Sequence, residues 1–179
     1  EQTASSSATI DFLNGTSDVV LDSTYPIYLF KFINCHPATN AVNLSFQCST
    51  NAGSSYGMTI TNTYFRAYQY EDGSSGSGVS YVDAFDYAQS TSNIMIHENT
   101  GNDNDQSISG EMWLFNPSST TYVKHYMTRT QNYNGSDITT DAYTAGYINS
   151  TDDVDAIKFL FSSGNIDAGT IKLYGIKDS

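Results

Sequence analysis

Alternation of apolar and polar residues at every second position is the feature that most constrains this chain. Residues 42–48 show it clearly, because every second side chain there is apolar and those between are Asn, Ser or Gln. Successive side chains of a β-strand point to opposite faces, so this pattern predicts a strand with one buried face. Helical periodicity is nearly absent, and the abundant Ser, Thr, Asn, Tyr, Val and Ile favour sheets and turns.

The same reasoning predicts strands along the whole chain of 179 residues. The predicted strands are residues 8–12, 19–21, 27–33, 42–48, 58–70, 94–96, 108–115, 122–130, 157–161 and 170–176, with 138–148 as a weaker strand pair or an extended loop. Residues 27–33 are apolar at nearly every position, which predicts a central strand buried on both faces.

Turn signals such as Asn14-Gly15 and Asn134-Gly135 separate these strands. Many short strands between regular turns are typical of a sandwich or barrel. We therefore predict an all-β, jelly-roll-like antiparallel β-sandwich, as a single domain over residues 1–179. Residues 71–78 and 97–106 are polar and are predicted to be surface loops.

The balance of charge excludes several classes of partner. Seven Lys and Arg residues stand against nineteen Asp and Glu residues, for a formal net charge of −12. Such a surface repels phosphate backbones and anionic lipid headgroups, so we expect no nucleic acid partner. No apolar run approaches the ~20 residues that span a bilayer, so no membrane insertion is expected.

Catalytic motifs are not evident. The three histidines, His36, His97 and His125, lie in no H-E-x-x-H pattern, and the chain has no G-x-S-x-G elbow and no glycine-rich phosphate loop. We therefore expect a protein that is not an enzyme and that needs no cofactor, although a dispersed triad is defined by geometry and leaves no motif.

Calcium is the metal that the sequence most suggests. Two acidic clusters contain Asp103 with Asp105, and Asp152 with Asp153 and Asp155. Carboxylates two residues apart on a loop can converge on one calcium ion. The first cluster lacks the glycine and terminal glutamate of a hand-type calcium loop, and the alternative is that both clusters are solvated acidic turns.

Two cysteines, Cys35 and Cys48, lie on neighbouring predicted strands. A disulfide between them would close a short loop and stabilise the fold by roughly 3 kcal/mol in the chain-entropy model. The alternative is a pair of buried thiols that act as small hydrophobic side chains. Their spacing does not match a structural zinc site.

Aromatic side chains offer a second kind of binding site. The chain has fourteen Tyr, nine Phe and one Trp, and flat aromatic faces can pack against sugar rings. The candidate glycan-binding residues are Trp113, Tyr68, Tyr70 and Tyr133. The alternative is that most of them line the core or a subunit interface. Asn-x-Ser/Thr sequons at Asn14, Asn43, Asn134 and Asn149 would matter only in a glycosylating host.

Both ends of the chain resemble a known family. Residues 162–176 read SSGNIDAGTIKLYGI and follow DAIKF at 155–159, and this ending resembles the closing hairpin of a β-sandwich domain in virion proteins of tailed phages, especially marine and cyanobacterial phages. The opening resembles the same family in SSSATIDF at 5–12, YPIY at 25–28, INCHPAT at 33–39 and STNAG at 49–53. The middle of the chain has no detailed match.

This resemblance implies a non-enzymatic virion structural protein on the surface of the particle. It would be a capsid decoration or a module of a head or tail fibre, and it would assemble with itself, as a homotrimer, and with other virion proteins. Host attachment through a surface glycan is a further implication. The alternative that the residues leave open is a carbohydrate-binding β-sandwich module, either a fibre tip or a secreted lectin-like domain.

Overall fold

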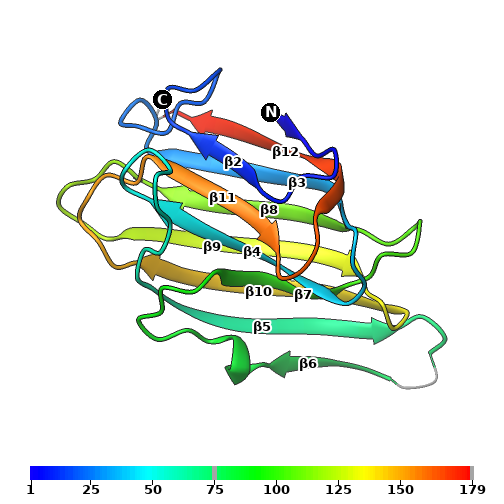
Figure 1. Ribbon diagram of the computed structural model, residues 1–179. Coiled ribbons are helices and arrows are strands. Elements are labelled where there is room, and N and C mark those ends of the chain that lie inside the picture. The colour runs from blue at the N-terminus through cyan, green and yellow to red at the C-terminus, as the bar shows by residue number, and fades with distance from the viewer. Residues whose placement is uncertain (74–75, 178–179) are drawn as a thin grey trace.

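Two antiparallel β-sheets stacked face to face make up the protein (Figure 1). The structure is a computed structural model that describes residues 1–73 and 76–177. Apart from one short 3-10 turn, η1 (Asp83–Phe85), the regular structure is all β, so the predicted all-β antiparallel sandwich is confirmed. Within the described residues, no helix is long and apolar enough to cross a bilayer.

The larger sheet has eight strands and the smaller has four. In spatial order, the large sheet contains β1 (Gln2–Thr3), β12 (Ile166–Ile176), β3 (Ile27–Pro37), β8 (Ile108–Phe115), β9 (Lys124–Tyr133), β10 (Ile138–Ile148), β5 (Ile60–Tyr70) and β6 (Ser77–Tyr81). The small sheet contains β2 (Ile10–Leu13), β11 (Ala156–Phe161), β4 (Val42–Ser49) and β7 (Ile94–Thr100).

Strands β2 to β5 alternate between the two sheets, whereas β8, β9 and β10 follow one another within the large sheet. The chain enters the small sheet with β2, crosses to the large sheet with β3, returns with β4 and crosses again with β5. This alternation is the jelly-roll-like feature of the fold, and it brings the two chain ends together as neighbouring strands. The ambiguous region 138–148 is a single long strand, β10, paired on both sides over its length.

Aromatic rings fill the space between the sheets. Phe159 of β11 lies at the centre, with its ring 5.3 Å from that of Phe30 and 5.1 Å from that of Phe32, both on β3. Phe12 of β2 packs against Phe159 at 6.3 Å, and all three pairs are edge to face. These side chains are 2% exposed or less, so they form the centre of the core.

Part of the interior is polar, and the sequence did not predict it. Residues 97–106 were expected to be a surface loop, but β7 continues through Thr100 and His97 is fully buried. The His97 ring faces Thr130 of β9, with Nδ1 2.8 Å from the Thr130 hydroxyl, and that hydroxyl donates to the Ile96 carbonyl at 3.1 Å. The prediction holds for residues 101–106, which form a loop, and is wrong for residues 97–100, because polar residues buried by neighbouring strands look the same in sequence as loop residues.

Two shorter predictions also differ from the structure. Residues 19–21 lie in a loop and do not form a strand, although the side chains of Val19 and Leu21 are buried. Strand β6 begins within the predicted loop 71–78. The alternation of Ser, Gly and Val in its sequence is too weak to predict a strand. Residues 74–75 of that predicted loop lie outside the described residues.

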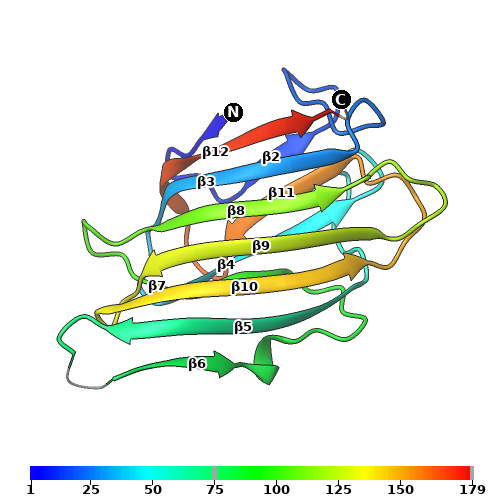
Figure 2. The same ribbon diagram turned by 180° about the vertical axis from the view of Figure 1, so that it is seen from behind.

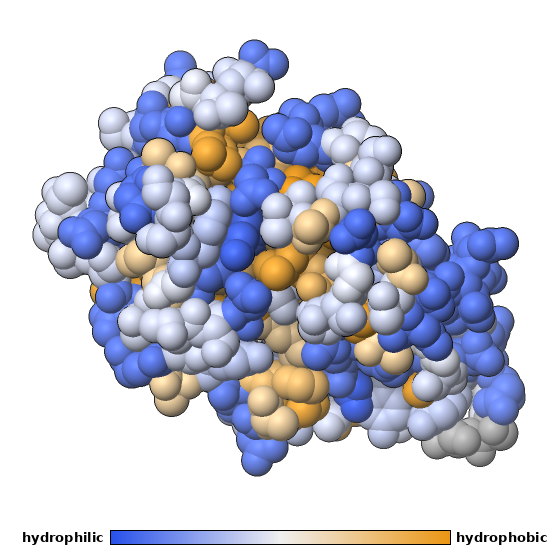
Figure 3. All heavy atoms as spheres, viewed as in Figure 1, coloured by the Kyte–Doolittle hydropathy of each residue, from blue (hydrophilic) through white to orange (hydrophobic). Residues whose placement is uncertain are grey.

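The outer face of the large sheet is bare. Figure 2 views this face, and no other segment among the described residues crosses in front of β3, β8, β9 or β10. Residues 27–33 were predicted to be buried on both sides, but the side chains that point outward from β3 are half-buried or exposed, with Ile33 41% exposed. The opposite side of the molecule, which the small sheet covers, is mostly polar with scattered apolar patches (Figure 3).

Candidate functional site: the outer face of the large sheet

Side chains on the outer face form rows that run across the strands. The rows follow from the register, because residues paired across antiparallel strands place their side chains on the same face. Lys31 pairs with Glu111, and Glu111 pairs with Arg129. Two residues further along the same strands, Leu29 pairs with Trp113, which in turn pairs with Met127.

Apolar side chains dominate one half of this face, over β12, β3, β8 and β9. We call them the apolar patch, which comprises Ile27, Leu29, Trp113, Phe115, Met127, Tyr174 and Ile176. All seven are at least partly exposed, and Met127 and Tyr174 are 50% and 48% exposed. None carries a charge, although the chain as a whole is strongly acidic.

A row of charged residues borders the apolar patch. It contains Lys172, Lys31, Glu111 and Arg129, and so holds three of the seven Lys and Arg residues of the chain. Each cation is paired: Lys31 with Glu111, Lys172 with Glu1 at 3.3 Å, and Arg129 with Asp141 at 2.9 Å. The row is therefore close to neutral, although the chain as a whole carries a large negative charge.

Trp113 is held in place within the patch. Its indole Nε1 donates a hydrogen bond to Glu111 Oε1 at 3.0 Å. The Lys31 ammonium binds the other carboxylate oxygen, and these hydrogen bonds, that of Lys31 first, lower the pKa of Glu111. A fixed aromatic ring loses little conformational entropy when a partner packs against it.

Aromatic side chains continue the charged row onto β10 and β5. The rings of Tyr143 and Phe65 are stacked in parallel with centroids 4.8 Å apart, and the Arg129 guanidinium lies 5.2 Å from the centroid of Tyr143. Asp141 orients that guanidinium through two hydrogen bonds, from Nε at 3.1 Å and from Nη2 at 2.9 Å. The Tyr143 hydroxyl also donates to Asp141 at 3.1 Å.

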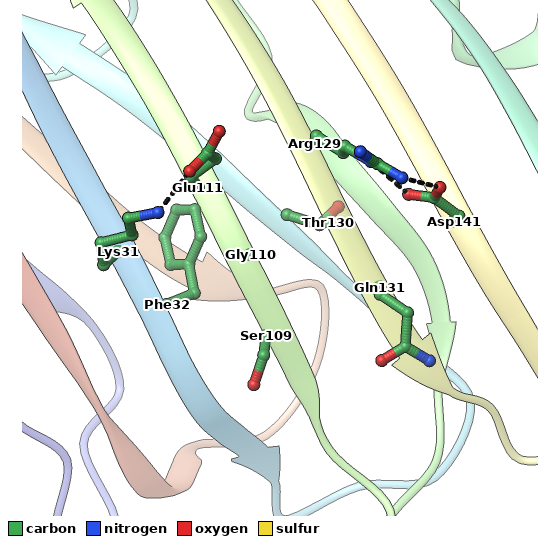
Figure 4. Close-up of a pocket in the computed structure, with 9 residues that line it drawn as sticks. All are labelled: Lys31, Phe32, Ser109, Gly110, Glu111, Arg129, Thr130, Gln131 and Asp141. Carbon is green, nitrogen blue, oxygen red and sulfur yellow. Dashed lines mark hydrogen bonds and ion pairs between the residues drawn. The ribbon is translucent and has the colours of Figure 1, made fainter.

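A shallow hollow of about 500 Å³ lies beside the charged row (Figure 4). It forms where the register between β3 and β8 shifts, between Phe32 and Cys35, and where Gly110 has no side chain to fill the space. The Lys31–Glu111 pair and the Arg129–Asp141 pair stand on its two sides. Ser109 and Gln131 add hydrogen-bonding groups to these charged side chains at the rim of the hollow.

The structure separates Trp113 from the other predicted glycan-binding aromatics, Tyr68, Tyr70 and Tyr133. Tyr70 and Tyr133 line one hollow of about 300 Å³ at the end of the outer face, and the Tyr133 hydroxyl is bound by Glu71 at 2.7 Å. Trp113 lies some 20 Å away, since its partner Met127 is six residues from Tyr133 along β9. Tyr68 stays beside Tyr70, with the two ring centroids 6.3 Å apart, and the Arg66 guanidinium carbon lies 5.5 Å from the Tyr68 ring centroid.

The acidic clusters do not converge. Asp103, Asp105, Asp152 and Asp153 are exposed, and the Asp155 carboxylate accepts the backbone N–H of Ala52 at 2.9 Å, which holds the turn after β4. Burial raises the pKa of Asp153, with a further contribution from Asp155. Across residues 1–73 and 76–177, no three His, Cys, Asp or Glu side chains form a group that could hold a metal ion.

Cys35 and Cys48 are free thiols in the core, so the alternative of two buried thiols applies and the predicted disulfide is not formed. They lie on strands of opposite sheets. Cys35 is two residues before the end of β3, whereas Cys48 is six residues after the start of β4. The offset of four residues corresponds to about 13 Å along the strands, further than a disulfide reaches. Burial raises the pKa of Cys35 to about 12 and raises that of Cys48 as well.

Sequence reasoning identified Trp113 but missed the residues around it. Leu29 and Met127 were assigned to strands without a role, and Lys31, Glu111 and Arg129 were not grouped. The signal was present in residues 27–33, where apolar side chains occupy both faces. We interpreted these side chains as buried on both faces by other strands of the same chain.

Comparisons with known proteins leave the family open. No protein-family model matches the chain, and no curated protein matches it. One solved structure, described as a structural-genomics protein of unknown function from Bacteroides ovatus at 2.40 Å resolution, is 7% identical, with a TM-score of 0.22 over 86% of this chain and 47% of its own. The chain thus spans about half the length of that structure, and a likeness this low carries no conclusion about fold or function.

Proposed function

We propose that this protein is a non-enzymatic structural protein on the surface of a tailed-phage virion, either a capsid decoration or a module of a head or tail fibre. It acts by adhesion: the apolar patch packs against copies of itself, in a homotrimer, and against other virion proteins. The observation that carries this proposal is the uncharged apolar patch on the open face of a strongly acidic chain. The likeness of both chain ends to phage virion proteins supports the same class.

The dimensions of the outer face suit such an interface. The six strands from β12 to β5, about 4.8 Å apart, span about 24 Å, and eight residues along each strand add about 26 Å. The resulting face of roughly 600 Å² is comparable with the ~800 Å² that each partner buries in a standard protein interface. An apolar centre bordered by paired charges also matches the usual arrangement of core and rim.

The test is the oligomeric state in solution, measured by light scattering. We expect the wild-type protein to form a stable oligomer, and we expect Leu29→Lys to dissociate it, because a desolvated ammonium would be placed in the centre of the interface. Thr63→Lys is the matched control, since Thr63 is exposed on the same face but lies outside the apolar patch. A monodisperse wild-type monomer at high concentration would count against the proposal.

Carbohydrate binding is the second candidate. The observation that favours it is the partly exposed Trp113 indole, fixed by Glu111, next to a hollow with hydrogen-bonding side chains. On a glycan array, Trp113→Ala should then abolish binding, whereas Trp113→Phe, which keeps an aromatic face, should retain part of it. The absence of binding to any glycan would weaken this candidate without affecting the first.

A further inference from the structure

Four strands, β5, β7, β9 and β10, hold a concentration of buried polar atoms without partners. Buried polar groups in proteins are nearly always hydrogen-bonded, either to other protein groups or to ordered water. Seven buried side-chain atoms have no hydrogen-bond partner among the described residues, and all seven lie on these strands: Arg66 Nε, His97 Nε2, Tyr126 OH, Thr128 Oγ1, Asn132 Oδ1, Thr140 Oγ1 and Thr144 Oγ1. We call His97 Nε2, Asn132 Oδ1 and Thr140 Oγ1 the interior polar site.

The hydrogen bond to Thr130 fixes the tautomer of His97. The Thr130 hydroxyl has one hydrogen, which it donates to the Ile96 carbonyl at 3.1 Å. His97 Nδ1 lies 2.8 Å from the same hydroxyl oxygen, so Nδ1 must carry a hydrogen and donate it. Burial lowers the pKa of His97 to about 4, so the ring is neutral at pH 7 and has only one hydrogen on nitrogen. His97 Nε2 is therefore an acceptor.

The Asn132 amide is oriented by a second hydrogen bond. Its Nδ2 donates to the Glu98 carbonyl at 3.0 Å, and a carbonyl can only accept, so Oδ1 is the amide atom without a partner. Thr130 and Asn132 are two residues apart on β9 and share its inward face, which places Asn132 beside the His97 ring. Two acceptors cannot bond to each other, so His97 Nε2 and Asn132 Oδ1 need a donor between them.

Thr140 supplies the third group of the site. It pairs directly with Asn132 in the register of β9 and β10, which places the two Cβ atoms about 5 Å apart on the inward face. His97, Asn132 and Thr140 are all 1% exposed or less. The Thr140 hydroxyl can donate, but it forms no hydrogen bond with any of the described residues. A ligand that donates twice and accepts once would satisfy all three atoms.

We propose that one water molecule binds in the interior polar site, where it donates its two hydrogens to His97 Nε2 and Asn132 Oδ1 and accepts a hydrogen bond from the Thr140 hydroxyl. Buried waters typically make about three hydrogen bonds to polar groups that would otherwise be unsatisfied. This water connects β7 of the small sheet to β9 and β10 of the large sheet. The site is independent of the outer face and of the proposed virion role, so either proposal can fail alone.

Nuclear magnetic resonance of the wild-type protein at pH 8 tests the site. Long-range proton–nitrogen correlation spectra distinguish ring nitrogens with and without a hydrogen, and His97→Gln identifies the His97 signals by their loss. We expect a hydrogen on Nδ1, and Overhauser cross-peaks between the His97 ring protons and a long-lived water molecule. A hydrogen on Nε2 would overturn the proposal, because Nε2 would then donate directly to Asn132. Ring protons without contact to long-lived water would also overturn it.

Thr140→Val removes one hydrogen-bonding group of the site with little change in side-chain size. We expect the cross-peaks between water and His97 to be lost and the Nε2 signal to shift downfield, because Nε2 no longer accepts a hydrogen bond. Thr144→Val is the matched control and should leave both signals unchanged: Thr144 is also buried on the inward face of β10, but lies four residues, about 13 Å, from Thr140. Unchanged cross-peaks in a folded Thr140→Val protein, or equal loss in both variants, would contradict the proposal. The wild-type spectra decide the question if Thr140→Val does not fold.

Discussion

Protonation of His97 should destabilise the fold at mildly acidic pH. The ring is fully buried, and its Nδ1–H donates to the Thr130 hydroxyl, whose own hydrogen is used on the Ile96 carbonyl. Its Nε2 has no hydrogen-bond partner among the described residues. Burial lowers the pKa of His97 to about 4, although the nearby Asn132 side chain opposes part of this shift. The folded protein therefore holds a neutral imidazole.

The sign and size of the effect follow from linkage. The unfolded chain takes up the proton near pH 6.5, whereas the folded protein resists it until about pH 4, so the unfolded state binds more protons between these values and stability falls as the pH falls. With these two pKa values the loss at pH 5 relative to pH 8 is about 2 kcal/mol, and the full loss below pH 4 is about 3 kcal/mol.

Urea unfolding at pH 8 and pH 5, followed by circular dichroism, measures this loss. His97→Gln is the matched variant, because a glutamine amide can donate to Thr130 and does not titrate. Carboxylates titrate in both proteins, so the difference between the two pH dependences isolates His97. We expect the wild type to lose about 2 kcal/mol more than His97→Gln between the two pH values. Equal pH dependence of the two proteins would refute the buried, neutral histidine.

Three further predictions concern packing. Phe159→Ala should lower the free energy of unfolding in a urea titration by about 3–5 kcal/mol, because three edge-to-face contacts are lost at the centre of the core. In the same titration, Phe65→Ala on the open face should cost less than about 1.5 kcal/mol. Lys124→Met should cost about 2 kcal/mol, since its buried ammonium donates to the carbonyls of Ser119 at 2.6 Å and Ser150 at 3.0 Å, and a thermal melt checks this. Gly110→Ala should cost about 1–3 kcal/mol, because its Cβ would lie 2.6 Å from the Thr130 Cα and would push β9 away; an unchanged melting temperature would contradict this close approach.

Local sequence patterns determined the inward and outward faces of individual strands. In β9, the two-residue repeat places Lys124, Tyr126 and Thr128 on one face, and all three are buried. In β8, it places Met112 and Leu114 on the face opposite Trp113, and Met112 and Leu114 are buried while Trp113 is partly exposed. These predictions succeed because side-chain direction along a strand depends only on the backbone repeat of two residues.

Tertiary structure alone decided which faces are covered and which residues become neighbours. The pattern of β3 contains apolar side chains on both faces, but it cannot show that the second sheet covers only one of them. His97 is buried by pairing between strands far apart in the chain, and the row from Lys31 to Arg129 exists only because β3, β8 and β9 pair in one register. Burial and long-range register depend on how the whole chain closes, so the open outer face is a property of the assembled sandwich.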